Sequence, residues 1–196
     1  MTIAEMPIRP AARTVTVRAT IKRIEPIAVS LPMIKPMKMV GVEIRSADNV
    51  LVRIELDSGH IGWGEAASAH AMTGETVEGM LAAVRYMAPA LTGLAAGNIG
   101  QISARMDRLM YGNQSAKSAV EMASHDALGK AAGKPVYELL GSKRRARIPV
   151  LWLVGTGSAD GDVEEARNKL AAGFVAYKIK VGIGEPRDDA ERTTRI

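Results

Sequence analysis

The hydrophobic pattern of the chain changes near residue 147, and this change constrains the fold more than any other feature. Residues 148–154 form a continuous apolar run, which predicts a strand buried on both faces. Helical spacing follows over 160–172, and a second short strand is predicted over 177–181. Strand, helix and strand in this order form a βαβ unit with parallel strands. We therefore predict that 146–196 begins a parallel α/β domain.

Two lysines share one face of the second predicted strand. Because side chains alternate across a strand, Lys178 and Lys180 point to one side, and Tyr177, Ile179 and Val181 point to the other. On a strand with both faces covered, the two ammonium groups would lie close together and partly out of water. Both effects favour a neutral amine, which can act as a base near neutral pH. The alternative is a half-exposed strand with both lysines in water.

The chain before residue 146 is predicted to form an α+β domain over 13–145, after a loose extension over 1–12. A strand pattern covers 14–31, and Asp57-Ser58-Gly59 predicts the turn of a hairpin. Residues 31–39 carry two prolines and three methionines, which predicts a flexible apolar loop rather than a strand.

Helical spacing accounts for most of the remaining residues up to 140. The predicted helices cover 75–91, 98–110 and 115–132, followed by a turn at 136–140. Asn98 is the predicted N-cap of the second helix. The third helix carries a stripe of mostly small residues, which predicts close packing against a neighbour: Ala116, Ala119, Val120, Ala123, Ala127 and Leu128.

Composition narrows the possible functions. The net charge of +5 favours anionic partners, but one Phe and two Trp leave few rings for base stacking, so nucleic-acid binding is not predicted. No run approaches the roughly 20 apolar residues of a membrane span. The absence of cysteine excludes thiolate metal sites and a cysteine nucleophile. Residues 1–12 lack the apolar centre of a secretory signal, so we expect a cytoplasmic protein.

A glycine motif after the 148–154 strand raises nucleotide binding as a minor alternative. Gly155-Thr156-Gly157 resembles part of a dinucleotide-binding loop, but the next glycine is Gly161, one residue too late. Acidic residues, which we interpret as ordinary helix N-terminal residues, also crowd the site where a pyrophosphate needs positive potential. These residues are Asp160, Asp162, Glu164 and Glu165. The three histidines, His60, His70 and His125, lack partners at the spacing of a zinc site.

Several blocks resemble the enolase superfamily and, within it, the mandelate racemase/muconate lactonizing enzyme family. The main block is Gly-Asn-Gln-Ser-Ala-Lys-Ser-Ala-Val-Glu over 112–121, and Gly-Trp-Gly-Glu-Ala over 62–66 is another. Leu31-Pro32 with Pro36 and Lys38 resembles a mobile lid loop of the family. The lysine pair resembles the family's Lys-x-Lys strand, and the similarity spans the chain from about residue 15 onward.

This resemblance implies a fold and a chemistry. The fold is a cap domain, with a three-stranded antiparallel sheet and helices, followed by a modified TIM-type (β/α) barrel that this chain would only begin. The chemistry is removal of the proton next to a carboxylate, with Mg²⁺ or Mn²⁺ stabilising the enediolate. Lys180 would be the acid/base residue and Lys178 its neighbour. Ile34, Lys35 and Met72 would belong to lid loops over the substrate.

The resemblance also limits what this chain can do by itself. The family's metal carboxylates lie on later barrel strands, so no metal ligand is assigned here, and Asp188, Asp189 and Glu191 come too early. We expect the whole protein to be a homo-oligomeric isomerase of a small carboxylate, acting by cycloisomerization, racemization or epimerization. We expect this truncated chain alone to be inactive and prone to aggregate. The alternative is a non-catalytic cap-domain fragment that binds a full-length homologue.

Overall fold

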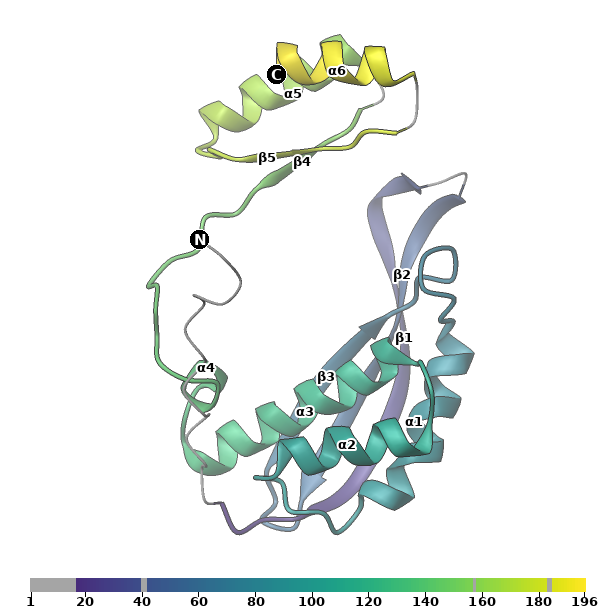
Figure 1. The fold of residues 1–196 in the computed structure, drawn as a ribbon, viewed down its shortest axis with the longest axis vertical. Coiled ribbons are helices and arrows are strands. Elements are labelled where there is room, and N and C mark those ends of the chain that lie inside the picture. The colour runs from purple at the N-terminus through teal and green to yellow at the C-terminus, as the bar shows by residue number, and fades with distance from the viewer. Residues whose placement is uncertain (1–16, 40–41, 157, 183–184) are drawn as a thin grey trace, which may run out of the picture. The chain divides into compact units, whose positions relative to one another are not determined.

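The computed structural model describes residues 17–39, 42–156, 158–182 and 185–196 (Figure 1). The chain divides into two compact units, one ending at Ser142 and the other beginning at Lys143. The predicted extension over 1–12, the first residues of the 14–31 strand and Gly157 lie outside the described residues. No helix in the described ranges has the length and apolarity of a membrane-spanning helix.

The first unit is built on a three-stranded antiparallel sheet, as predicted. The strands are β1 (Ile21–Met39), β2 (Val42–Leu56) and β3 (Ile61–Ala67), and their order in the sheet is β1-β2-β3. The predicted hairpin joins β2 and β3 through a turn in which Gly59 has a φ of 82°. Glycine adopts this left-handed conformation without the steric penalty of a side chain.

The predicted loop over 31–39 is wrong, because β1 continues as a strand to Met39 and pairs with β2. Pro32 lies opposite Ser46, and the register then shifts before Met37 lies opposite Ile44. An edge strand tolerates proline, since one of its sides needs no ladder hydrogen bond, and a bulge accommodates unpaired residues. The prolines therefore produce an irregular strand rather than a loop.

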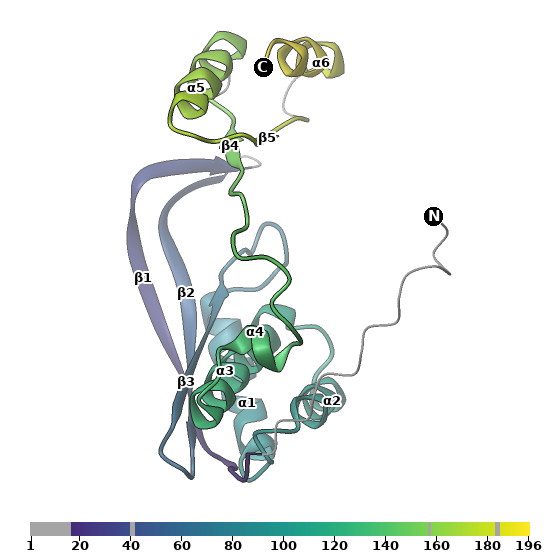
Figure 2. The ribbon, with the colours of Figure 1, turned by 90° about the vertical axis from the view of Figure 1, so that its left-hand side faces the viewer.

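Helices cover one face of this sheet, as the edge-on view in Figure 2 shows. They are α1 (Val77–Leu91), α2 (Ile99–Leu109), α3 (Gln114–Ala132) and the short α4 (Val136–Leu139). The predicted cap of the second helix is confirmed, because the Asn98 side chain accepts a hydrogen bond from the Gln101 N–H at 3.1 Å. α1 packs on β1, while α3 packs on β2 and β3. The core lies between these helices and the sheet.

Glycines in β3 let α3 approach the sheet closely. A Cβ atom on Gly62 would lie 2.0 Å from the carbonyl oxygen of Ala123, and one on Gly64 would lie 1.9 Å from that of Ala119. The predicted stripe of small residues on α3 is buried, with Ala119 and Ala123 completely inaccessible. Strand and helix therefore meet through backbone atoms, which only small residues on both elements permit.

The second unit contains β4 (Trp152–Val154), α5 (Ala159–Ala171), β5 (Tyr177–Ile179) and α6 (Pro186–Arg195). The predicted parallel pairing of its strands is confirmed, with Leu153 opposite Lys178. The predicted strand over 148–154 is too long and is not buried on both faces. Residues 148–151 lie outside the strand, and Ile148 and Val150 are 78% and 71% exposed. The apolar run lacks a covering layer among the described residues.

Candidate active site

The two lysines lie at the carboxyl end of the parallel strand pair. Lys178 is on β5, whereas Lys180 follows its last residue and still donates its N–H to the Val154 carbonyl at 3.2 Å. Val154 is buried, and the Trp152 ring meets the Phe174 ring edge-on with centroids 5.2 Å apart. Since side chains alternate along a strand, both lysines lie on the face of the strand pair opposite Trp152 and Val154.

Lys180 lies directly against the backbone of Gly155, the residue after β4. A Cβ atom built on Gly155 would be 3.4 Å from the Lys180 Cβ and 3.8 Å from its Cδ. Lys180 is half-buried and Lys178 is exposed. The other face of β5 meets the helical layer, because the Tyr177 hydroxyl lies 3.0 Å from the Ala166 carbonyl oxygen. The aliphatic stem of Lys180 therefore lies beside the chain that follows β4.

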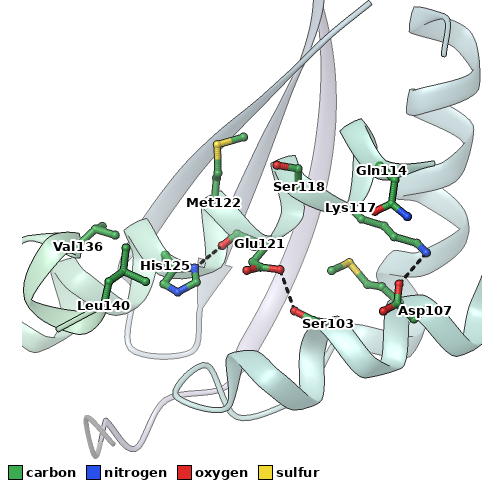
Figure 3. Close-up of a pocket in the computed structure, with 11 residues that line it drawn as sticks. Ser103, Asp107, Gln114, Lys117, Ser118, Glu121, Met122, His125, Val136 and Leu140 are labelled. Carbon is green, nitrogen blue, oxygen red and sulfur yellow. Dashed lines mark hydrogen bonds and ion pairs between the residues drawn. The ribbon is translucent and has the colours of Figure 1, made fainter. Parts of the chain in front are cut away.

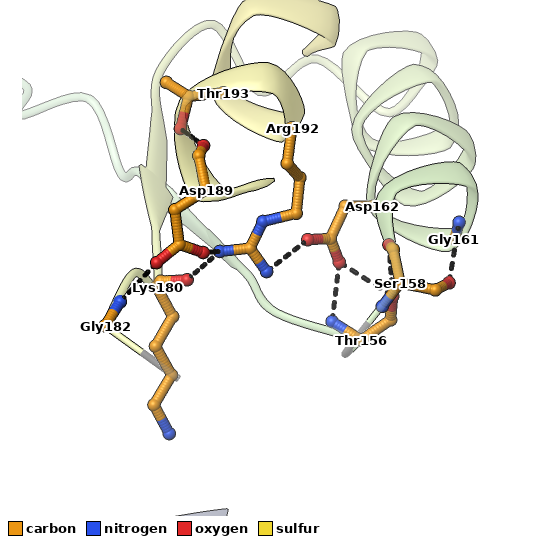
Figure 4. A network of polar contacts seen from close by, with 9 residues as sticks. All are labelled: Thr156, Ser158, Gly161, Asp162, Lys180, Gly182, Asp189, Arg192 and Thr193. Carbon is orange, nitrogen blue, oxygen red and sulfur yellow. Dashed lines mark hydrogen bonds and ion pairs between the residues drawn. The ribbon is translucent and has the colours of Figure 1, made fainter. Parts of the chain in front are cut away.

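A polar network ties the residues around Lys180 to both helices of the unit (Figure 4). Asp162 accepts hydrogen bonds from the Thr156 N–H at 2.6 Å and hydroxyl at 2.7 Å, and Arg192 Nη1 lies 3.1 Å from its other oxygen. Arg192 Nη2 lies 2.9 Å from Asp189 Oδ1 and donates to the Lys180 carbonyl. The Gly182 N–H donates to Asp189 at 2.6 Å.

Asp162 corrects one interpretation of the sequence. The sequence predicts that the acidic residues near the start of α5 are ordinary helix N-terminal residues, but the Asp162 side chain is completely buried and paired with Arg192. Its partner lies thirty positions away along the chain, so no local pattern could reveal it. Asp162 also occupies the Thr156 N–H, a donor that the alternative of a phosphate-binding loop requires.

The predicted lid residues all belong to the first unit. Ile34 and Lys35 lie where the β1–β2 register shifts, and both are exposed. Met72 lies in the loop between β3 and α1, is 66% exposed, and lines a small pocket of about 80 Å³ with Val42 and Ile44 of β2. Both predicted lid segments therefore meet the same part of β2.

A pocket of about 550 Å³ lies elsewhere in the first unit, beside α2, α3 and α4 (Figure 3). The buried Lys117 donates to Asp107 at 2.9 Å and to the Met110 carbonyl at 2.6 Å. Ser103 donates to Glu121 at 2.8 Å. No local sequence pattern predicts this pocket, because the polar residues that line it lie on two different helices, α2 and α3.

The described residues do not fit a divalent metal ion. They contain no group of three or more His, Asp or Glu side chains placed to hold one. Asp188 and Glu191 are exposed on α6, and Asp189 is engaged by Arg192 and Gly182. His60 and His70 are exposed, while His125 Nδ1 lies 3.1 Å from the Glu121 carbonyl oxygen of its own helix.

Solved structures with this fold define the class of protein. The chain is similar to a member of the enolase superfamily from Roseovarius nubinhibens ISM, with a TM-score of 0.83 and 29% identity over 91% of this chain and 49% of that one. It is also similar to a dipeptide epimerase from Cytophaga hutchinsonii complexed with Mg and the dipeptide D-Ala-L-Val. That TM-score is 0.81, with 31% identity over 90% of this chain and 48% of that one. The fold is that of the enolase superfamily.

The family follows from the sequence match. Residues 13–141 match the model of the family described as "Mandelate racemase / muconate lactonizing enzyme, N-terminal domain". The chain therefore belongs to the mandelate racemase/muconate lactonizing enzyme family, as its resemblance predicted.

Relatives in this family are isomerases. The chain is 36% identical to muconate cycloisomerase 1-1 of Acinetobacter lwoffii, over 90% of this chain and 48% of that protein. It is 35% identical to the L-Ala-D/L-Glu epimerase of Bacillus subtilis (strain 168), over 89% of this chain and 48% of that protein. The chain thus spans about half the length of the curated relatives it matches.

Proposed function

We propose that this chain supplies the cap and the acid/base lysine of an isomerase that moves a proton next to a substrate carboxylate. Family membership supports this reaction class, because muconate cycloisomerase and L-Ala-D/L-Glu epimerase are among the relatives. The substrate of the whole protein is a small carboxylate, and the reaction is a racemization, an epimerization or a cycloisomerization. A cytoplasmic location, a homo-oligomeric state and the absence of nucleic-acid and membrane partners stay predictions.

The observation that carries the proposal is the position of Lys180. It follows β5 and lies against Gly155, which follows β4, so it sits where two parallel strands both end. In parallel α/β folds this is the end of the strands at which active sites are built. A half-buried lysine at this position can reach a substrate and accept its proton.

Lys178 has a supporting role in the proposal. It precedes Lys180 by two positions, and strand alternation places both side chains on the same face. The positive charge of Lys178 attracts the substrate carboxylate. Ile34, Lys35 and Met72 are proposed to contact the substrate from the lid segments. Mg²⁺ or Mn²⁺ stays a prediction for the whole protein, and the steps proposed for this chain are binding and proton transfer.

The experiment is α-proton exchange in deuterated water, measured on the whole protein by mass spectrometry. The probes are D-Ala-L-Val, N-succinyl-L-Arg and muconolactone, which the names of similar proteins indicate. Lys180→Ala should lower the exchange rate by about 10³-fold, since a positioned general base contributes about 10²–10⁴-fold. Binding of the probe should stay measurable. Lys143→Ala, at an exposed position, is the control.

Two results would count against the proposal. Exchange that persists in Lys180→Ala would remove Lys180 from the role of base. Exchange that is absent from the natural protein with every probe, together with binding to a full-length homologue in size-exclusion chromatography, would favour the non-catalytic cap-domain fragment instead.

A further inference from the structure

Arg192 is a buried arginine that joins segments from both strands and both helices of the second unit. The residue is 9% exposed, and it lies on α6. Nη1 contacts Asp162 of α5, and Nη2 contacts both Asp189 and the carbonyl of Lys180. Asp162 in turn holds Thr156 in the loop after β4. The guanidinium group therefore links the chain after β5 to the chain after β4 (Figure 4).

These contacts fix the backbone of Lys180 on both sides. Its N–H donates to the Val154 carbonyl of β4, and its carbonyl accepts from Arg192. Two residues later, the Gly182 N–H donates to Asp189, which is itself paired with Arg192. Because the orientation of the backbone sets the direction of the Cα–Cβ bond, anchoring these groups also sets the side of the strand from which the Lys180 stem extends.

The chemistry of the contacts requires arginine. A planar guanidinium presents several N–H donors at fixed angles, and here they serve two carboxylates and one carbonyl oxygen. A lysine offers a single ammonium group on a flexible stem and cannot hold the same three acceptors in this geometry. Arg192 Nε is buried without a hydrogen-bond partner among the described residues. Burying an unsatisfied donor costs free energy, so stability alone does not explain an arginine at this position.

We propose that Arg192 is a positioning residue for Lys180. Resting on the function proposed above, the inference adds that the guanidinium group holds the Lys180 carbonyl and so directs the amine toward the substrate proton. Asp162 and Asp189 hold Arg192 itself in place. Arg192 need not touch the substrate in this role.

The test compares Arg192→Lys with Arg195→Lys in the whole protein. Arg195 lies on the same helix and pairs with the exposed Asp160, so the control makes the same chemical change away from Lys180. We expect Arg192→Lys to lower kcat for α-proton exchange by about tenfold or more, because the base is then wrongly oriented toward the substrate proton. KM should stay within about twofold of the value for the natural protein, because substrate binding is not changed. Arg195→Lys should change neither value.

A second readout needs no turnover. Lysines are reductively methylated with ¹³C, and the Lys180 resonance is assigned from its loss in Lys180→Arg. In Arg192→Lys this resonance should shift toward the position of exposed lysines, whereas Arg195→Lys should leave it unchanged. An unchanged Lys180 resonance in folded Arg192→Lys would overturn the proposal, with or without a change in kcat.

The two proposals fail in different ways. Exchange that survives Lys180→Ala would refute Lys180 as the base, and the methyl resonance would still decide whether Arg192 positions it. If Arg192→Lys does not fold, Asp189→Asn weakens the contacts of residue 189 to both Arg192 and Gly182 while leaving the Asp162–Arg192 ion pair in place. A Lys180 resonance that does not move in Asp189→Asn would then overturn the positioning role.

Discussion

At Gly64, the difference between a hydrogen atom and a methyl group decides whether α3 can reach the sheet. The nearest atom to an added Cβ is a backbone carbonyl oxygen of α3, which cannot rotate away as a side chain can. Any larger residue would have to push helix and strand apart and would disturb the alanines packed beneath them. The glycine is therefore a packing requirement of the first unit.

We predict that Gly64→Ala lowers the free energy of unfolding by about 3 kcal/mol or more, at the upper end of the cost of overpacking. Gly100→Ala is the matched control, because a Cβ there meets nothing within 4 Å and the residue is in α2. Alanine favours a helix, so this control should be neutral or slightly stabilising. Urea unfolding measures both. Equal stability of the two variants would contradict the close approach.

The Asp57 carboxyl makes the stability of the fold depend on pH. Hydrogen bonds from the Thr20 N–H at 3.0 Å and then from the Thr20 hydroxyl at 2.9 Å hold the pKa of the Asp57 carboxyl below its usual range. A depressed pKa means that the folded state favours the charged form. The resulting stability is fully present above the pKa of the unfolded state and is lost as the pH falls through the folded pKa.

We predict that the natural chain loses stability relative to Asp57→Asn as the pH falls below about 4, the ordinary range for aspartate. Above about pH 5 the difference between the two should be constant. Thr20→Val keeps the N–H donor and removes the hydroxyl, so it should reduce the pH dependence without abolishing it. Thermal unfolding across pH 2–7 checks this. Parallel curves for the natural chain and Asp57→Asn would show that Asp57 does not contribute.

At the element scale, α3 begins with a cap that comes from a distant part of the chain. Asn113, which precedes the helix, has a φ of 54° and makes no side-chain capping bond. Instead, the Glu75 carboxylate accepts from the Ser115 N–H at 3.0 Å and from the Ser115 hydroxyl at 2.6 Å. A carboxylate at a helix N-terminus satisfies free N–H groups and interacts favourably with the helix dipole.

We predict that Glu75→Gln destabilises the first unit by about 1 kcal/mol, the usual size of a capping interaction. The matched control is Glu78→Gln, which makes the same change at an exposed position in the first turn of α1. Urea unfolding should show a lower midpoint for Glu75→Gln with an unchanged slope. Equal midpoints for both variants would mean that Glu75 does not cap α3.

The strands show where element prediction failed. Local composition around Pro32 and Pro36 predicted a loop, but pairing with β2 supplied enough hydrogen bonds to keep β1 extended to Met39. The apolar run over 148–154 predicted seven strand residues, but only Trp152–Val154 finds a partner in β5. In both cases the length of a strand follows from its neighbour, and the neighbour is not encoded in the local sequence.

At the scale of the whole molecule, the second unit exposes an unusual number of large apolar side chains. They include Ile148, Val150, Leu151, Leu153, Val175 and Val181, each about half exposed or more. Its strand pair also has open edges, because no strand other than β4 and β5 belongs to this sheet in the part of the chain that the structure describes. Exposed apolar surface and unpaired strand edges both favour association between chains.

We predict that the 196-residue chain alone self-associates, with an apparent mass in light scattering above the 20.9 kDa of one copy. Replacing Ile148 and Val150 together by Lys should reduce this association, because both positions lie in the exposed apolar surface. Replacing the exposed Glu78 and Gln101 by Lys introduces the same residues in the first unit and should not. A monomeric natural chain at about 100 μM would contradict the prediction.

Local sequence patterns were enough to predict most of the elements, though not the lengths of β1 and β4, and they also indicated the family. Hydrophobic periodicity is a local property, so the helices of the first unit, the β2–β3 hairpin and the parallel pairing of β4 with β5 could all be predicted. Strand alternation also predicted that Lys178 and Lys180 share a face. The role of these lysines as the catalytic pair stays a prediction.

Which distant groups meet depends on how the elements pack in three dimensions. Glu75 caps a helix that begins some forty residues later, Gly64 makes room for Ala119, and Asp162 pairs with Arg192 across thirty residues. No sequence separation predicts these contacts, because they arise from the packing of whole elements against each other. The surroundings of Lys180 also depend on contacts between distant residues. Arg192 reaches the Lys180 carbonyl, and Gly155 lies beside the Lys180 stem, only when both strands and both helices are in place.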